Sequence, residues 1–271
     1  MNLPPVGFGT SPYRGGARID IEEPVRLALA AGYRMFDLAE MYGTERAVGR
    51  ALRTSGTPRR ELQLIGKAWK TNFRPEHLRR ACADSLQRLG VEAFDLYLLH
   101  APDALQHVAP LEEPQTIGWD EFQRRALPAV TDDVPLRETW EAMQALRAAG
   151  LTAEIGVSNF TPEQIELLGE PHPAANQVAC WPSGWQQRDA MTVLVYSPLR
   201  RDLLATPLLA TIASAHARTP AQILLRWLVQ RGVHPLTSST DPARIRQSLA
   251  LDFELATSDM SALDDLAATI S

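Results

Sequence analysis

The chain has few cysteines and no long apolar run. Its 271 residues contain two cysteines, Cys82 and Cys180, without the paired spacing of a disulfide framework or a thiolate metal site. No uncharged apolar stretch could span a bilayer, and residues 1–9 show no basic segment followed by an apolar one. We therefore expect a cytoplasmic protein with no bound metal, no membrane partner and a buried Cys82.

The chain also lacks an excess of positive charge. It has 27 basic and 32 acidic residues, which gives a formal net charge of -5. Such a chain offers no basic field to a nucleic-acid backbone or to an anionic membrane surface. We therefore expect a small molecule, and no nucleic acid, as its partner.

Lysine is scarce as well. Only Lys67 and Lys70 are lysines, and every other basic residue is an arginine. Arginine supplies the positive charge elsewhere in the chain, so a lysine at the end of an apolar run indicates a chemical role. Lys67 ends such a run, Leu64–Lys67, and is a candidate functional residue.

Short β-branched or aromatic runs alternate with longer amphipathic stretches, which is typical of a parallel sheet with connecting helices. Eight strands are predicted, over Val6–Thr10, Met35–Ala39, Leu62–Lys67, Phe94–His100, Glu154–Ser158, Ala175–Val178, Thr192–Tyr196 and Val233–Leu236. Helices are predicted over Glu22–Ala31, Thr44–Thr54, Pro75–Leu89, Leu136–Ala149, Pro162–Leu168, Pro207–Ala217, Pro220–Gln230, Pro242–Leu249 and Ser258–Ala268. No linker divides the chain, so we expect residues 1–271 to form one α/β domain, a (β/α)8 TIM barrel.

Two connections depart from this regular pattern. Residues 101–135 are too long for an ordinary strand–helix connection, and loops of that length are often functional. Trp119 and Phe122 in this loop either cover a substrate pocket or anchor the loop to the barrel. The stretch from Gln177 to Tyr196 is short, so the sixth helix is expected to be a single turn or absent.

Four polar residues lie where a barrel places its active site, at the carboxyl ends of strands. Asp37, Lys67 and His100 each end an apolar run, and Tyr42 follows Asp37 closely. Each has an ordinary structural alternative: Asp37 as a helix cap, Lys67 as a solvated strand end, His100 in the core and Tyr42 in a wall. If all four roles were structural, these polar residues would meet at the same end of three strands only by coincidence. A shared functional role is therefore favoured.

These four residue types suit proton transfer to a carbonyl group. A phenol has a pKa of about 10, and a nearby ammonium lowers it. Lys67 could supply that charge to Tyr42, and the carboxylate of Asp37 would keep Lys67 protonated. His100 could bind and orient the carbonyl oxygen.

The sequence resembles the aldo-keto reductase family over nearly its whole length. The segments that carry this resemblance are Gly32–Glu45, Lys67, Phe94–His100, Ile155–Phe160, Asn176–Val178 and Val195–Leu199. The resemblance implies hydride transfer from a reduced nicotinamide cofactor to the carbonyl carbon of an aldehyde or ketone. It also implies that Tyr42 protonates the carbonyl oxygen, and it favours a monomer.

The resemblance also implies a set of cofactor-binding residues. Amide side chains would bind the carboxamide, and an aromatic face would hold the planar nicotinamide ring. By position, the implied residues are Ser158, Asn159, Gln177, Tyr196, Ser197, Leu199, Thr237, Ser238 and Arg244. In the structural alternative, Ser158 and Asn159 form a turn with a helix cap, and Tyr196 is core.

The expected cofactor is NADPH, with NADH as an alternative. Gly7–Phe8–Gly9 lacks the third glycine of a Rossmann fingerprint, so barrel loops would have to hold the dinucleotide. The family often has a lysine after the proline of the last strand, where this chain has Leu236. Arg244 remains, and its forked donors suit a 2′-phosphate.

Two other functions stay open at this stage. A cofactor-binding regulatory protein of the same fold could turn over slowly. A barrel lyase or isomerase could use Lys67 as a Schiff-base nucleophile, although Tyr196, Asn159 and Gln177 would then have no role.

Overall fold

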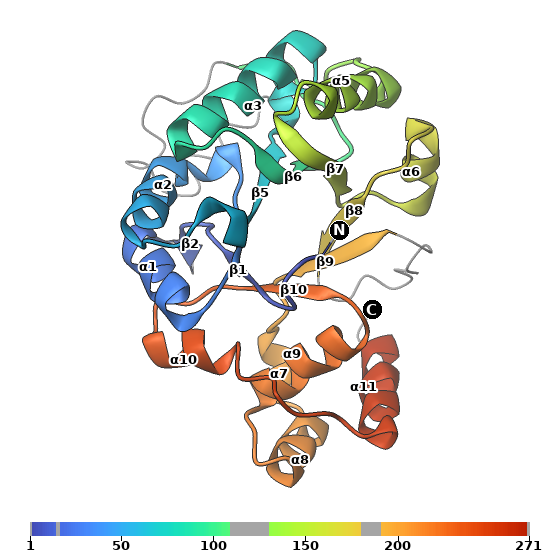
Figure 1. Ribbon diagram of the computed structural model, residues 1–271. Coiled ribbons are helices and arrows are strands. Elements are labelled where there is room, and N and C mark those ends of the chain that lie inside the picture. Colours follow the sequence, from blue (N-terminus) through green and yellow to red (C-terminus); the bar gives the residue numbers. More distant parts are fainter. Residues whose placement is uncertain (1, 15–16, 109–129, 180–190, 270–271) are drawn as a thin grey trace.

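Parallel strands close into a barrel with helices around it (Figure 1). The computed structural model describes residues 2–14, 17–108, 130–179 and 191–269. The barrel strands are β1 (Gly7–Gly9), β4 (Met35–Asp37), β5 (Gln63–Ala68), β6 (Phe94–Leu99), β7 (Thr152–Ser158), β8 (Ala175–Ala179), β9 (Thr192–Tyr196) and β10 (His234–Thr237). Pairing of β10 with β1 closes the ring. All eight expected strands are present, which confirms the predicted (β/α)8 barrel.

The predicted helices are also present, most of them within one or two residues of their expected ends. They are α1 (Glu22–Ala31), α2 (Glu45–Thr54), α3 (Pro75–Leu89), α5 (Leu136–Ala148), α6 (Pro162–Leu168), α8 (Pro207–Ala215), α9 (Pro220–Gln230), α10 (Pro242–Gln247) and α11 (Thr257–Thr269). The sequence did not predict the β2–β3 hairpin, the short α7 or the 3-10 turns. Their bounds are β2 (Tyr13–Arg14), β3 (Ala17–Arg18), α7 (Arg201–Leu204), η1 (Glu40–Tyr42), η2 (Arg59–Glu61) and η3 (Lys70–Asn72).

Local chemistry explains where several helices begin and end. Thr161 and Thr219 each form a capping box with a glutamine three residues later, which satisfies two backbone groups of the first turn. Gly90 ends α3 in the left-handed region, with φ of 76°, and its N–H bonds the carbonyl of Leu86. The chain therefore turns back toward the barrel at defined residues.

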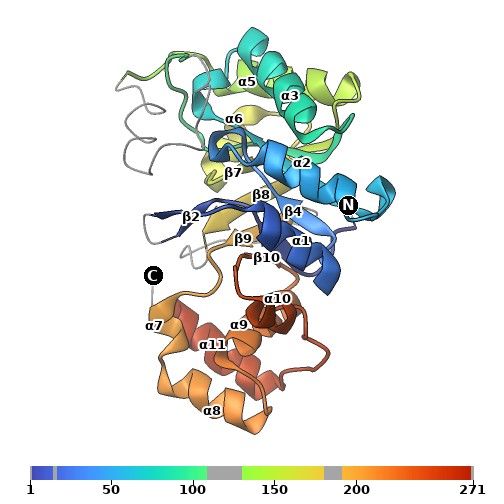
Figure 2. The same ribbon diagram turned by 90° about the vertical axis from the view of Figure 1, so that its left-hand side faces the viewer.

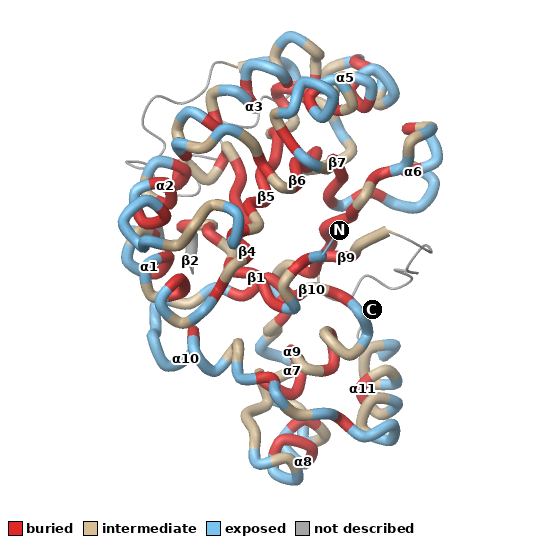
Figure 3. Tube along the Cα trace, viewed as in Figure 1, coloured by how far each residue is buried: buried red, intermediate tan, exposed pale blue. Residues whose placement is uncertain are grey.

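Buried apolar side chains occupy the interior of the barrel. Met35, Ile65, Leu96, Leu98 and Leu236 belong to one buried apolar cluster, to which strands from around the ring contribute. A second layer of apolar side chains packs between the strands and the helices, whose outer faces are exposed (Figure 3). Because the interior is packed, a ligand must bind at one end of the barrel.

The two ends of the barrel carry different segments. Figure 2 shows the β2–β3 hairpin at one end and the N-terminal segment at the other. Trp119, Phe122, Cys180 and most of the short connection before β9 lie outside the described residues. Where the structure describes the chain, Cys82 is buried as expected, and no helix is long and apolar enough to cross a bilayer.

Gly156 in β7 lies where the barrel wall leaves no space for a side chain. A Cβ on Gly156 would lie 2.5 Å from the carbonyl oxygen of Ala175, whereas a Cβ on Gly9 would meet its nearest atom at 3.6 Å. Gly156→Ala should lower the free energy of unfolding by about 3 kcal/mol, because the neighbouring backbone cannot move aside without strain. Gly9→Ala, the matched control, should change it by less than about 1 kcal/mol. Urea unfolding of both variants checks this, and equal stabilities would contradict it.

Candidate active site

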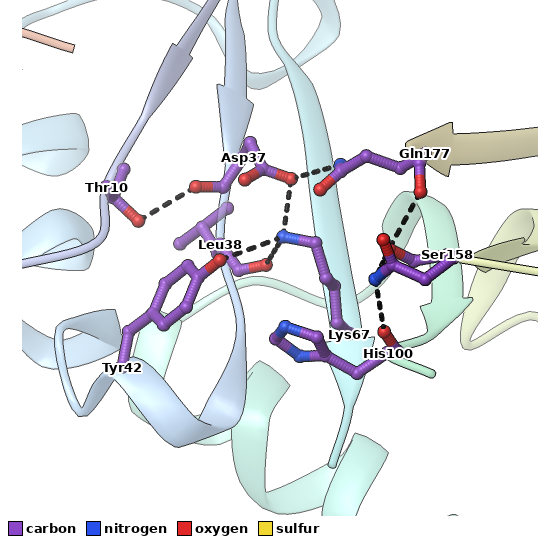
Figure 4. A network of polar contacts seen from close by, with 9 residues as sticks. Thr10, Asp37, Leu38, Tyr42, Lys67, His100, Ser158 and Gln177 are labelled. Atoms are coloured by element: carbon purple, nitrogen blue, oxygen red, sulfur yellow. Dashed lines mark hydrogen bonds and ion pairs between the residues drawn. The ribbon is translucent and has the colours of Figure 1, made fainter. Parts of the chain in front are cut away.

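A buried ion pair lies at the carboxyl ends of β4 and β5. The ammonium of Lys67 is 2.6 Å from Oδ1 of Asp37, and the two side chains are 1% and 6% exposed. Lys67 Nζ also donates a hydrogen bond of 2.9 Å to the carbonyl oxygen of Leu38 (Figure 4). The pair is therefore shielded from solvent and held by backbone as well as by charge.

Strand alternation explains why these side chains meet. Side chains two residues apart share one face of a strand. Met35 and Ile65 belong to the apolar cluster that fills the barrel, so Asp37 and Lys67 follow them on the same face as its uppermost layer. His100 follows Leu98 of that cluster in the same way, one residue past the end of β6.

Tyr42 reaches this group from η1, the turn that follows β4. Lys67 Nζ donates to the Tyr42 hydroxyl at 3.4 Å, and lies 5.1 Å from the centre of the phenol ring. The His100 ring stands edge-on to Tyr42, with centroids 6.0 Å apart, and edge-on to Trp69 at 5.0 Å. The structure thus brings together all four residues that the sequence singled out.

Burial and neighbouring charges shift the pKa values of Lys67 and Tyr42. Burial lowers the pKa of Lys67, and the charge and hydrogen bond of Asp37 oppose this. Burial raises the pKa of Tyr42 well above its usual value, and the charge of Asp37 and the nearby Tyr196 raise it further. The expected lowering of the phenol pKa is therefore wrong, because burial raises this pKa and the charges of Asp37 and Tyr196 act in the same direction. Tyr42 is protonated at neutral pH.

His100 is a neutral imidazole beside the ion pair. Burial lowers its pKa well below the usual value, and Lys67 and Lys70 lower it further. Its Nδ1 is buried and has no hydrogen-bond partner among the described residues. Buried polar atoms are normally satisfied by protein, ligand or water, so this ring is suited to an external oxygen ligand.

Three predicted cofactor-binding residues belong to the same network. Gln177 Nε2 donates to Asp37 Oδ1 at 2.7 Å, and Ser158 Oγ donates to the backbone oxygen of Gln177 at 2.9 Å. Asn159 Nδ2 donates to Ser158 Oγ at 3.1 Å and to the backbone oxygen of His100 at 3.2 Å. The Gln177 amide from β8 therefore contacts the ion pair directly (Figure 4), and the Asn159 amide, just after β7, joins the network through Ser158 and His100.

Tyr196 and Ser197 extend the site along β9. Tyr196 is half-buried, and its hydroxyl donates to Asn159 Oδ1 at 2.9 Å. Asn159 and Ser197 have φ values of 63° and 53°, a conformation that is uncommon outside glycine and clusters at ligand sites. An aromatic face beside paired amide donors and acceptors fits a nicotinamide carboxamide.

The remaining predicted cofactor residues lie at the ends of β9 and β10 and on α10. Leu199 is partly buried, and Ser238 is exposed just after β10. Thr237 is buried, and its hydroxyl is within 2.9 Å of the Tyr33 hydroxyl, so it is engaged inside the fold. The Arg244 side chain is 78% exposed and lies 3.6 Å from Asp241. Ser238 and Arg244 are thus accessible to a phosphate.

Glu40 and Asn72 are site residues that the sequence did not single out. Glu40 Oε1 accepts hydrogen bonds from Asn72 Nδ2 at 2.6 Å and from the backbone N–H of Trp69 at 2.8 Å. Burial raises the pKa of Glu40 to about 7, against the lowering effect of both hydrogen bonds. The only sequence signal for Glu40 was an acidic residue three positions after Asp37. Its hydrogen-bond partners could not be predicted, because they lie about thirty residues away in the chain.

The chain is similar to proteins of known family and fold. The family model described as "Aldo/keto reductase family" matches residues 5–197 and 184–268. The chain is 35% identical to "Dihydrodiol dehydrogenase 3" of Bos taurus over 97% of its length and 88% of that protein. It is also 35% identical to "Aldo-keto reductase family 1 member C3" of Homo sapiens, over 97% and 88%. Its structure is similar to that of the aldose reductase from Schistosoma japonicum, with a TM-score of 0.86, 32% identity, and 99% and 90% coverage of the two chains.

The buried pair should be stable only as a pair. Lys67→Met leaves the Asp37 carboxylate buried without its counter-charge, so we expect a loss of about 3 to 5 kcal/mol in unfolding free energy. The double variant Asp37→Asn/Lys67→Met should recover part of that loss, because it buries no net charge. Urea unfolding at pH 7.5 measures both. If Lys67→Met were as stable as the parent, the pair would not be the anchor that its geometry suggests.

Proposed function

The chain belongs to the aldo/keto reductase family, and we propose that it reduces an aldehyde or ketone with NADPH, with Tyr42 as the proton donor. The observation that carries this proposal is the meeting of the Tyr42 hydroxyl, the Lys67–Asp37 pair and the His100 ring at one end of the barrel. The family supports carbonyl reduction in general. The roles of the residues are argued below from their contacts.

The cofactor would supply the hydride that the carbonyl carbon accepts. As that carbon is reduced, the carbonyl oxygen becomes an alkoxide, which is a stronger base than a phenolate. Tyr42 can therefore give up its proton even though its pKa is raised, and Lys67 stabilises the phenolate that remains. His100 would donate a hydrogen bond to the same oxygen and orient the carbonyl.

The side chains at the ends of β7 to β10 would hold the cofactor. Asn159, Gln177 and Ser158 would bind the carboxamide, and Tyr196 would stack on the nicotinamide ring, which requires Asn159 to exchange some of its present partners. Ser197, Leu199, Thr237, Ser238 and Arg244 would surround the phosphates and the adenosine end. We propose that residues 1–271 act as one domain in this reaction.

The contacts of Lys67 argue against a Schiff-base lyase. Its three N–H groups have three acceptors, on Asp37, Leu38 and Tyr42, and a nucleophilic amine would need a free lone pair. A slow regulatory protein is the other alternative. A complete set of proton-transfer residues favours the enzyme over it.

Replacement of Tyr42 tests the proposed function. With NADPH and an aromatic aldehyde, Tyr42→Phe should lower kcat by about 100- to 10,000-fold, because the alkoxide loses its proton donor. Loss of cofactor absorbance measures the rate. Tyr97→Phe is the matched control: Tyr97 is buried on β6, and its hydroxyl has no partner among the described residues. If Tyr42→Phe turns over at the rate of the parent, Tyr42 is not the proton donor. If the parent itself does not turn over, the proposed carbonyl reduction is wrong.

Replacement of Arg244 tests the choice of cofactor. Arg244→Ala should weaken NADPH binding about 10-fold and leave NADH binding unchanged, because only the former has a 2′-phosphate for the guanidinium. Quenching of tryptophan fluorescence measures both affinities. Arg246→Ala, which removes an exposed charge from the same helix, is the control. Equal affinities of Arg244→Ala and the parent for NADPH would show that Arg244 does not bind the 2′-phosphate.

A further inference from the structure

Glu40 links two elements of the site that are not adjacent in the chain. It opens η1, the turn that carries Tyr42, and its Oε1 accepts from the backbone N–H of Trp69 at 2.8 Å. Trp69 follows Lys67 by two residues, at the end of β5. The same oxygen accepts from Asn72 Nδ2 at 2.6 Å, on η3. One carboxylate oxygen thus joins the turn of the proposed acid to the strand of its cationic partner.

We propose that Glu40 is a positioning residue whose carboxylate holds the Tyr42 turn against the end of β5 and so sets the rate of proton transfer. The inference rests on the proposed function, because it concerns the alignment of Tyr42 with Lys67. Glu40 touches neither of these side chains through its carboxylate in the contacts described, and it acts through the backbone of η1 and of Trp69.

The geometry of the site makes this alignment sensitive. The distance of 3.4 Å between Lys67 Nζ and the Tyr42 hydroxyl is at the long end of the hydrogen-bond range. A small shift of η1 relative to β5 would therefore break this contact. The Trp69 ring also packs edge-on against His100, so the N–H that Glu40 holds belongs to a residue that supports the other side of the site.

The link continues to the base of the long loop. Asn72 donates to Glu40 through Nδ2, so its Oδ1 is directed to the opposite side, 3.0 Å from His107 Nδ1. His107 Nδ1 is also 3.1 Å from the backbone oxygen of Thr71. Two acceptors require His107 Nδ1 to carry the proton. Glu40 is therefore connected through Asn72 to His107, near the start of the long connection that follows β6.

The ionisation of Glu40 gives the proposal a measurable signature. Burial raises the pKa of Glu40 to about 7; the bonds from Asn72 and Trp69 lower it, Glu45 raises it, and Arg88 lowers it. Two other groups face it from α3 and β6: the pKa of the Cys82 thiol is raised to about 12, and that of the Tyr97 phenol is raised well above its usual value. His107 contacts the same Asn72 side chain through Oδ1, 3.0 Å from its Nδ1.

The charged form of Glu40 should be the one that holds the turn. A carboxylate accepts stronger hydrogen bonds than a neutral carboxyl or amide group. Since the folded-state pKa is raised, the carboxylate and its two strong bonds form as the pH rises through about 7. Turnover should rise over the same range.

The kinetic test compares Glu40→Gln with the parent from pH 6 to pH 9, with NADPH and an aromatic aldehyde. At pH 8.5 we expect kcat to be about 10-fold lower in Glu40→Gln, with KM within about twofold, because alignment is weakened while binding is kept. At pH 6 the two rates should converge, since both side chains are then neutral. The inflection near 7 should be absent from Glu40→Gln. An inflection that persists in this variant belongs to another group and overturns the proposal.

Asp95→Asn is the matched control. Asp95 Oδ2 also accepts from a backbone N–H of β5, that of Leu64 at 2.7 Å, but Leu64 lies three residues before Lys67. Asp95→Asn should lower stability and keep the pH profile of the parent. The same loss of the inflection in Asp95→Asn would mean that the effect is a general weakening of the strand, against the proposal.

A second measurement needs no turnover. In protein labelled with 15N-tryptophan, the backbone amide of Trp69, assigned by its absence from Trp69→Phe, should shift with a midpoint near pH 7 in the parent and not in Glu40→Gln. A Trp69 amide that does not titrate overturns the role of Glu40. If the parent shows this titration but reduces no carbonyl compound, the proposed function fails while the Glu40 contact stands.

Discussion

The site depends on a lysine and an aspartate that are buried together at the top of the barrel. Isolated, either charge would cost several kcal/mol to remove from water, and their attraction offsets this only with good geometry and further hydrogen bonds. Here Lys67 also donates to Leu38 and Tyr42, while Asp37 accepts from Gln177. Every other feature of the site is arranged around this pair.

The pair also fixes the protonation of its neighbours. Burial dominates the pKa of Tyr42, the charge of Asp37 raises it further, and the phenol keeps its proton at neutral pH. His100 is held neutral by burial and by the nearby lysines. A protonated phenol beside a neutral imidazole suits reduction, in which a proton must be delivered to the carbonyl oxygen.

Much of this arrangement could be predicted from the sequence, because it follows from short-range rules. Asp37, Lys67 and His100 each end an apolar run, which placed them at the carboxyl ends of strands, and threonine caps and glycines fixed the helix ends. The role of Glu40 could not be predicted, since its partners lie far along the chain and only the fold brings them together. The sign of the Tyr42 pKa shift could not be predicted either, because it depends chiefly on how deeply the fold buries the phenol.

A crystal structure of the protein with NADP+ and an unreacted carbonyl compound would test this account most directly. The account predicts that the carbonyl oxygen lies within hydrogen-bond distance of both the Tyr42 hydroxyl and a ring nitrogen of His100, with the nicotinamide against Tyr196 and the Lys67–Asp37 pair intact. A carbonyl compound bound away from Tyr42, or joined covalently to Lys67, would contradict it.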